Sequence, residues 1–253
     1  MHTPTDEAYD RGYEWWLMKE AQRRNPGLVL YCLPWTFPGW VTTSGKGGTT
    51  TNQDLGAIAE VLTEKTADYV ARWVDGAQTH HNLTIAFLGL WNEHPPTPDY
   101  ALYLRAALDR SVSGKATQLV GPDWHFSAGP LVPFLTALVS NASVRAAISR
   151  VGFHYPKRGR WSVPSLMEGV TQPVWSSEES STIDTPAGGA CWARLLSQNY
   201  VVGKLTASIM WNLVTSFYTS LPYYGASLMN AAEPWSGHYE VSLSPCCCTF
   251  NLD

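Results

Sequence analysis

Residues 85 to 96 read IAFLGLWNEHPP, and this stretch decides the fold class. Seven residues without a charge or a hydrogen-bonding side chain, apart from the Trp91 indole, run directly into Asn92 and Glu93, and two prolines follow. An apolar run that does not alternate with polar residues is typical of a strand buried on both faces, as in a parallel sheet. The sequence therefore predicts a buried parallel strand that ends on a carboxylate.

Five further runs have the same character and alternate with segments of helical period. The other predicted strands are LVLYCLP (28–34), QLVGPDW (118–124), RVGFHYP (150–156), PVWSSE (173–178) and ASIMWNL (207–213). Helices are predicted over 7–24, 57–78, 99–112, 129–147 and 190–203, the first of them followed by the helix stop Asn25-Pro26-Gly27. Alternating strands and helices indicate either a (β/α) barrel or a doubly wound sheet.

The number of strands favours an incomplete barrel. The sequence shows six candidate strands and opens on a helix, whereas a closed barrel of this class has eight strands in about 250 residues. We therefore expect an α/β fold, an incomplete (β/α)8 TIM barrel with its first two strands missing. We assign residues 1–241 to this partial catalytic barrel and residues 242–253 to a divergent tail, whose three consecutive cysteines suit neither a spaced zinc site nor a spaced disulfide framework.

Composition excludes two classes of partner. Lys and Arg number 17 against 21 for Asp and Glu, so the net charge of −4 offers no broad basic surface and no nucleic-acid partner is expected. The nearest candidate for a membrane span, residues 207–224, is interrupted by polar residues and a proline, so we do not expect an integral membrane protein. No secretory signal peptide is recognisable in this chain.

Carboxyl groups stand at the ends of two predicted strands. Glu93 follows the strand at 85–91, and Glu178 ends the strand at 173–178, with Glu179 directly after it. In barrels of this class the active site lies at the C-terminal ends of the strands. Glycoside hydrolysis needs one carboxylic acid to protonate the leaving oxygen and one carboxylate to attack the sugar or to activate water. A strand-end Glu can also cap the next helix or pair with an Arg, but a second one in a matching position favours catalysis.

Other polar and aromatic residues at strand ends are candidates for support. His154 and Tyr155 end the strand at 150–156 and can hydrogen-bond a catalytic carboxylate, although a structural core histidine is an equal alternative. Trp211 ends the last strand and is either a platform for a sugar ring or a core residue. His80 and His81 are adjacent without a metal-binding motif, and no nucleophile elbow of a serine hydrolase occurs. We expect no metal and no cofactor.

Longer motifs resemble a known family. They are RGYEWWLMKEAQRRNP (11–26), LPWTFPGW (33–40), LGLWNE (88–93), GFHYP (152–156), VWSSEESST (174–182), GGACWARLLSQNY (188–200), MWNLVTSFY (210–218) and AAEPWSGHY (231–239). In this order, over most of residues 6–241, they resemble the galactosylceramidases of glycoside hydrolase family 59.

The resemblance implies a retaining β-galactosidase that acts on galactosylceramide and related galactolipids by double displacement. It assigns Glu93 as the acid/base, Glu178 as the nucleophile and Asn92 as a contact of the sugar 2-hydroxyl. It leaves Glu179 without a role.

Further positions and partners follow from the same resemblance. Trp35, Ser181 and Trp211 match substrate-pocket positions. The family also implies a lysosomal location, reached by the secretory route, and a saposin-type activator that presents the lipid. Asn82 and Asn141 stand in glycosylation acceptor tripeptides, which are meaningful in such a compartment.

Two alternatives stay open, and the chain departs from the family pattern. The alternatives are a glucosylceramidase-like or other retaining β-glycosidase, and a non-catalytic carbohydrate- or lipid-binding barrel remnant. The family's first two strands and its lectin-like region are not found, and the family's disulfide partner of Cys191 is expected outside this chain. Because unpaired strand edges and apolar surface would be exposed, we expect these 253 residues alone to fold poorly and to be inactive.

Overall fold

The computed structural model describes residues 9–43, 45, 61–95, 97–125, 128–156, 167–179, 186–216, 227, 229–231, 233 and 236–241. The chain forms two compact units, Met1–Gly152 with Met167–Gln172, and Phe153–Leu166 with Pro173–Asp253. The boundary falls inside one strand, β4, so each unit holds part of that strand. The predicted tail at 242–253 lies outside the described residues.

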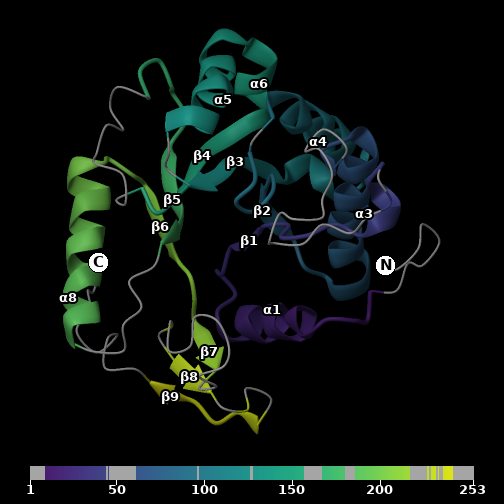
Figure 1. The fold of residues 1–253 in the computed structure, drawn as a ribbon. Helices are drawn as coiled ribbons and strands as arrows, with labels where there is room; N and C mark the ends of the chain where they lie inside the picture. The colour runs from purple at the N-terminus through teal and green to yellow at the C-terminus, as the bar shows by residue number, and fades with distance from the viewer. Residues whose placement is uncertain are drawn as a thin grey trace. The chain divides into compact units, whose positions relative to one another are not determined.

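The first unit alternates helices and strands as expected (Figure 1). Its described elements are α1 (Tyr13–Arg24), β1 (Leu30–Cys32), η1 (Gly39–Val41), α3 (Glu64–His81), β2 (Ile85–Gly89), α4 (Pro98–Arg110), η2 (Gly114–Ala116), β3 (Gln118–His125), α5 (Ala128–Ser140), α6 (Ala142–Ala147) and most of β4 (Ile148–His154). Strand β1 pairs with β2, and β2 with β3, all in parallel, and β4 follows β3 in the sheet order.

Local chemistry sets where these helices begin and end. Helix α1 begins at Tyr13 rather than at the predicted residue 7, because Gly12 has a φ of 106°, which is outside the helical region. It ends as predicted, where the Asn25 backbone N–H still donates to the Ala21 carbonyl. Helix α3 begins after Thr63, whose hydroxyl accepts a hydrogen bond from the Thr66 backbone N–H.

The helix predicted over 129–147 is in fact two helices, and the prediction of a single helix was wrong. The Asn141 side chain accepts hydrogen bonds from the backbone N–H groups of Ser143 and Val144, and so caps a new helix, α6. An asparagine oxygen competes with the helical backbone for these donors, which favours a break at that position.

The close approach of β2 to its neighbours depends on a glycine. A Cβ atom at Gly89 would lie 2.5 Å from the Asp123 Oδ2 atom and would also overlap the Leu33 side chain. Asp123 is fully buried and accepts a hydrogen bond of 2.8 Å from the Tyr31 hydroxyl. The glycine therefore leaves room for a buried carboxyl group near the C-terminal ends of β1, β2 and β3.

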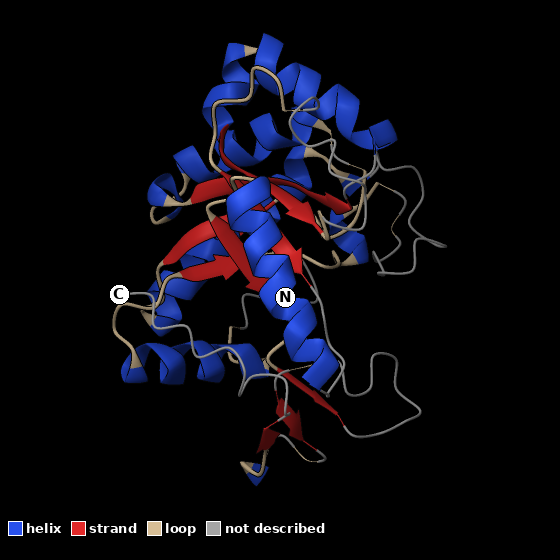
Figure 2. Cartoon of the chain, turned by 90° about the vertical axis from the view of Figure 1, so that its left-hand side faces the viewer, coloured by secondary structure: helices blue, strands red, loops and turns tan. Residues whose placement is uncertain are grey.

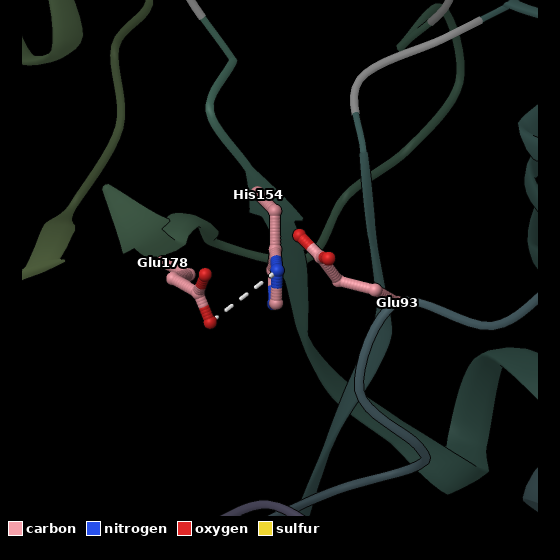
Figure 3. Close-up of side chains that lie close together, drawn as sticks. All are labelled: Glu93, His154 and Glu178. Carbon is pink, nitrogen blue, oxygen red and sulfur yellow. Dashed lines mark ion pairs between the residues drawn. The ribbon is translucent and has the colours of Figure 1, made fainter. Parts of the chain in front are cut away.

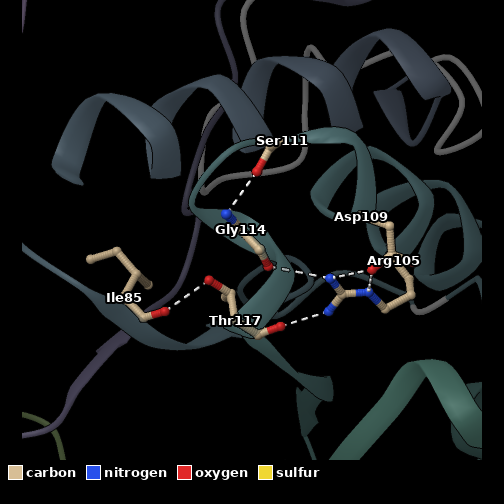
Figure 4. Close-up of polar contacts among 6 residues, drawn as sticks. All are labelled: Ile85, Arg105, Asp109, Ser111, Gly114 and Thr117. Atoms are coloured by element: carbon tan, nitrogen blue, oxygen red, sulfur yellow. Dashed lines mark hydrogen bonds and ion pairs between the residues drawn. The ribbon is translucent and has the colours of Figure 1, made fainter. Parts of the chain in front are cut away.

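A polar network closes the connection from α4 to β3 (Figure 4). The Arg105 guanidinium donates to the carbonyls of Thr117 at 2.6 Å and Gly114 at 3.2 Å, and pairs with Asp109. The Thr117 hydroxyl donates to the Ile85 carbonyl at 2.8 Å, which ties this connection to the start of β2. These bonds connect α4, the turn that contains η2, and the start of β2.

The second unit contains the remaining parallel strands. Its described elements are the end of β4, β5 (Val174–Glu179), α8 (Pro186–Ser197), the π-helix η3 (Gln198–Val202), β6 (Ala207–Met210), β7 (Val214–Ser216), β8 (Met229–Ala231) and β9 (Glu240–Val241), and Figure 2 distinguishes its helices from its strands by colour. Strand β5 follows β4 in the sheet order and pairs in parallel with β6.

Two predictions for this unit need correction. The helix predicted over 190–203 begins earlier, at Pro186, and Gln198–Val202 form the π-helix η3. The strand predicted over 207–213 ends at Met210. Strands β7, β8 and β9 form a separate small sheet, in which β7 and β8 are parallel and β8 and β9 antiparallel, and no periodic pattern in the sequence predicted this sheet.

No helix in the described part of the chain is long and apolar enough to cross a membrane.

Cys32 and Cys191 carry free thiols. Burial raises the pKa of the Cys32 thiol to about 12, so this thiol stays protonated.

Candidate active site

Glu93 stands on the loop that follows β2, in the first unit. Its backbone has a φ of 50°, which is uncommon for a residue other than glycine, and its N–H donates to the Asp123 carbonyl at 3.0 Å. The side chain remains 28% exposed. A residue held in a sparsely populated backbone region needs support from its surroundings, and such residues cluster at functional sites.

The loop after β1 is joined to the same strand end. The Asn92 backbone N–H donates to the Pro34 carbonyl at 2.9 Å, and the Trp91 indole donates to the Trp35 carbonyl at 3.3 Å. The Trp35 side chain is 40% exposed. The structure thus brings together Trp35, Asn92 and Glu93, three of the predicted site residues.

The Asn92 side chain has an unused hydrogen-bond acceptor in this cluster. Its side chain is 5% exposed, and its Oδ1 atom has no hydrogen-bond partner among the described residues. A buried polar atom without a partner costs free energy, and a bound molecule with a hydroxyl group can satisfy it. The position therefore suits a contact with a polar ligand.

His94, which follows, is held inside the same loop. Its ring stacks on Trp91 with centroids 3.6 Å apart, and its Nδ1 atom lies 2.6 Å from the Asn92 carbonyl oxygen. Burial lowers the pKa of His94, and the Asn92 carbonyl and the Glu93 carboxylate oppose this shift more weakly. The imidazole is thus biased toward its neutral form.

The last residue of β3 was missed in the sequence. His125 Nδ1 lies 3.2 Å from Glu93 Oε1, which makes it an immediate neighbour of the candidate acid/base. The predicted strand at 118–124 stopped one residue short of it. The signal that identified Glu93, a polar residue at the C-terminal end of a buried strand, applies equally to His125.

Glu178 lies near the end of β5, in the second unit, and is buried (Figure 3). The Tyr155 hydroxyl donates to Glu178 Oε1, and His154 Nδ1 lies 3.6 Å from Glu178 Oε2. The Tyr155 backbone N–H also donates to the Glu178 carbonyl at 2.9 Å. His154 and Tyr155 therefore both lie against this carboxylate. A donor to a carboxylate favours its ionised form.

Glu179 has different surroundings. The register of β5 against β6 is irregular between Ser176 and Glu179, and Glu179 has other hydrogen-bond partners than Glu178. Ser176 Oγ donates to Glu179 Oε2 at 3.2 Å, and Asn199 Nδ2 donates to the same atom at 3.5 Å. With 2% exposure, Glu179 is a buried carboxylate bound to residues of its own strand and of η3.

The remaining predicted pocket residues are Trp211 and Ser181. The Trp211 backbone N–H donates to the Glu179 carbonyl at 2.8 Å, so Trp211 follows β6 directly beside the end of β5. Its side chain is neither fully buried nor fully exposed. Ser181 lies outside the described residues.

Solved structures show the fold class. SrfJ from Salmonella typhimurium superposes with a TM-score of 0.68 at 17% identity, over 91% of this chain and 55% of that one. A glycoside hydrolase family 30 subfamily 8 xylanase, Xyn30A from Clostridium acetobutylicum, superposes with a TM-score of 0.60 at 19% identity, over 78% of this chain and 51% of that one. Together with the strand order, these similarities confirm an incomplete (β/α)8 barrel.

A barrel of this kind that carries carboxyl groups at two strand ends has the features of a glycoside hydrolase. The profile of Glycosyl hydrolase family 59 matches residues 1–246, and the chain belongs to this family. The resemblance stated from the sequence motifs is thereby confirmed.

Curated relatives agree. The galactocerebrosidase of Mus musculus is 42% identical over 245 residues, and that of Homo sapiens is 39% identical over 243 residues. These matches cover 96% and 95% of this chain but 32% of either relative. The chain thus spans about a third of the length of these relatives.

Proposed function

We propose that this chain carries the catalytic carboxyl groups of a retaining glycosidase that removes β-galactose from galactosylceramide and related galactolipids. Family membership and the galactocerebrosidase relatives support the substrate class. The observation that carries the mechanism is the setting of Glu178, a buried carboxylate that accepts the Tyr155 hydroxyl and lies beside His154.

Glu178 is the proposed nucleophile. Its carboxylate attacks the anomeric carbon, a bond forms between that carbon and the carboxylate oxygen, and the bond to the glycosidic oxygen breaks. Attack requires the ionised form, which the Tyr155 hydroxyl favours. Glu179 is the alternative nucleophile on the same strand, but its carboxylate accepts hydrogen bonds from Ser176 and Asn199 instead of Tyr155.

Glu93 is the proposed acid/base. It gives its proton to the departing glycosidic oxygen, and afterwards it accepts a proton from the water that releases galactose from Glu178. Its partial exposure supports this role, because the group must exchange protons with substrate and water. A retaining mechanism requires the two carboxyl groups to act about 5–5.5 Å apart.

Asn92, Trp35, Trp211 and Ser181 are proposed substrate contacts. The partnerless Asn92 Oδ1 suits a hydrogen bond from the sugar 2-hydroxyl. The half-exposed Trp35 indole provides an apolar face for a sugar or a lipid chain.

The remaining proposals concern the cell. We propose a lysosomal glycoprotein of sphingolipid metabolism that acts with a saposin-type activator. Asn82 and Asn141 are both exposed, which a glycosylation site requires. Each uses its Oδ1 atom in an internal hydrogen bond, which leaves the Nδ2 atom for the sugar.

The test compares two proteins. One is the 253-residue chain, and the other is a chimera in which the chain replaces the matching 245 residues of the mouse galactocerebrosidase. Each is assayed with fluorogenic β-galactoside and β-glucoside and with galactosylceramide. We expect the chimera to hydrolyse the galactosides and to lose this activity on Glu178→Gln. Preference for the glucoside would favour a glucosylceramidase-like enzyme, and binding of galactose by the folded chimera without hydrolysis would favour a non-catalytic remnant.

A further inference from the structure

The segment from Asp123 to His125 holds Glu93 at two points. The Asp123 carbonyl accepts the Glu93 backbone N–H at 3.0 Å, and His125 Nδ1 lies 3.2 Å from Glu93 Oε1. Glu93 and Asp123 both have positive φ values, 50° and 55°. The backbone contact thus sets where the Glu93 Cα lies, and the imidazole is placed to set where its carboxyl group lies.

Asp123 and Trp124, which precede His125, are held by contacts of their own. Asp123 is fully buried and accepts a hydrogen bond from Tyr31, while the Trp124 ring packs edge to face against the His125 ring at 5.3 Å. His125 itself is 49% exposed along its side chain. Because about half of the His125 side chain is exposed, core packing does not explain its contact with Glu93.

Glutamate is a flexible side chain, and a general acid acts only when its proton lies within hydrogen-bonding reach of the leaving oxygen. The 3.2 Å contact between His125 Nδ1 and Glu93 Oε1 restricts the rotamers of the Glu93 side chain. Either group can provide the proton in this contact, because Nδ1 donates to a carboxylate and accepts from a carboxylic acid.

We propose that His125 is a positioning residue for Glu93, which holds the carboxyl group where it can protonate the glycosidic oxygen. This proposal rests on the proposed function, because it presumes that Glu93 is the acid/base.

The test uses leaving groups of different acidity. An alkyl β-galactoside needs a proton on its leaving oxygen. From 2,4-dinitrophenyl β-galactoside the leaving group departs as the stable dinitrophenolate anion and needs no proton. We expect His125→Leu to lower kcat/KM for the alkyl galactoside roughly 10- to 100-fold, the scale of misplacing a catalytic group, and to leave kcat/KM for the dinitrophenyl galactoside within about 3-fold. His125→Asn keeps an N–H at the place of Nδ1 and is expected to restore most of the loss. Equal losses for both substrates would overturn the proposal.

A second measurement needs no turnover. Unfolding midpoints are compared for the chimera and its His125→Leu, Glu93→Gln and double variants. We expect the double variant to be less destabilised than the sum of the two single shifts, because each single substitution already removes the shared contact. Additive shifts would overturn the proposal. Non-additive shifts in a folded chimera without any glycosidase activity would support the contact and contradict the proposed function instead.

Discussion

Glu93 lies on a loop, is 28% exposed and faces an exposed imidazole, whereas Glu178 lies within strand β5, is 9% exposed and faces Tyr155 and the fully buried His154. The difference matches the two proposed roles. An acid/base must gain and lose a proton in each cycle, so access to substrate and water serves it. A nucleophile must stay ionised and fixed, so a rigid, hydrogen-bonded setting serves it.

The largest effect is expected at Glu178. In the chimera, Glu178→Gln removes the attacking oxygen and is expected to lower kcat for every galactoside by a factor on the order of 10⁴ or more. Turnover of an aryl and an alkyl galactoside measures it. A variant that keeps a tenth of the activity would contradict the assignment.

At Glu93 the loss is expected to depend on the substrate. Glu93→Gln removes the proton that the leaving oxygen needs, and we expect kcat/KM, which reports formation of the galactosyl-enzyme, to fall roughly 100- to 10,000-fold for alkyl galactosides and much less for 2,4-dinitrophenyl galactoside. Added azide should then yield β-galactosyl azide, since the galactosyl-enzyme no longer has a base to activate water. A uniform loss without an azide product would place the acid/base elsewhere.

Tyr155→Phe removes a donor from Glu178 and keeps the ring. A hydrogen bond to a charged group contributes about 1.5–3 kcal/mol, so we expect kcat/KM to fall roughly 10- to 100-fold for all leaving groups alike. His238→Phe, at an exposed position in the same unit, is the control. Loss confined to alkyl substrates would link Tyr155 to the acid step instead.

Glu179 provides a stability counterpart to Glu178. One carboxylate oxygen accepts hydrogen bonds from both Ser176 and Asn199, and in Glu179→Gln a neutral amide oxygen accepts them more weakly. We expect the free energy of unfolding to fall by about 1–3 kcal/mol. Chemical denaturation measures this loss, and the folded fraction is expected to keep its nucleophile, so that it still forms a covalent galactosyl intermediate. Full stability with lost labelling would exchange the roles of the two residues.

The smallest effect is expected in the pH dependence of stability and involves His94. Because burial lowers the pKa of His94 in the folded chain, its stabilising contribution is complete above the unfolded value of about 6.5 and is lost as the pH falls from there toward the folded value. We expect Tm between pH 7 and 5 to fall less steeply in His94→Asn than in the parent, by about 2–4 °C. Parallel Tm curves would contradict a neutral buried His94.

The sequence predicted the parallel strands and both carboxylates, because a buried strand leaves a continuous apolar run that ends where the polar site begins. It could not show which of two adjacent glutamates faces Tyr155, since that depends on the phase of the strand. The single helix predicted over 129–147 was wrong because one asparagine cap outweighed a continuous apolar pattern. His125 was missed because the predicted strand ended at residue 124. Like Glu93, His125 is a polar residue at the C-terminal end of a buried strand, so the same criterion could have identified it.

Covalent trapping tests the central claim most directly. The chimera is treated with 2-deoxy-2-fluoro-β-galactosyl fluoride, and the peptides are mapped by mass spectrometry. We predict one fluorogalactosyl group, attached to Glu178 and absent from Glu178→Gln. A label on Glu179 or on any other residue, or a folded chimera that hydrolyses galactosides without acquiring a label, would contradict Glu178 as the nucleophile of a retaining galactosidase.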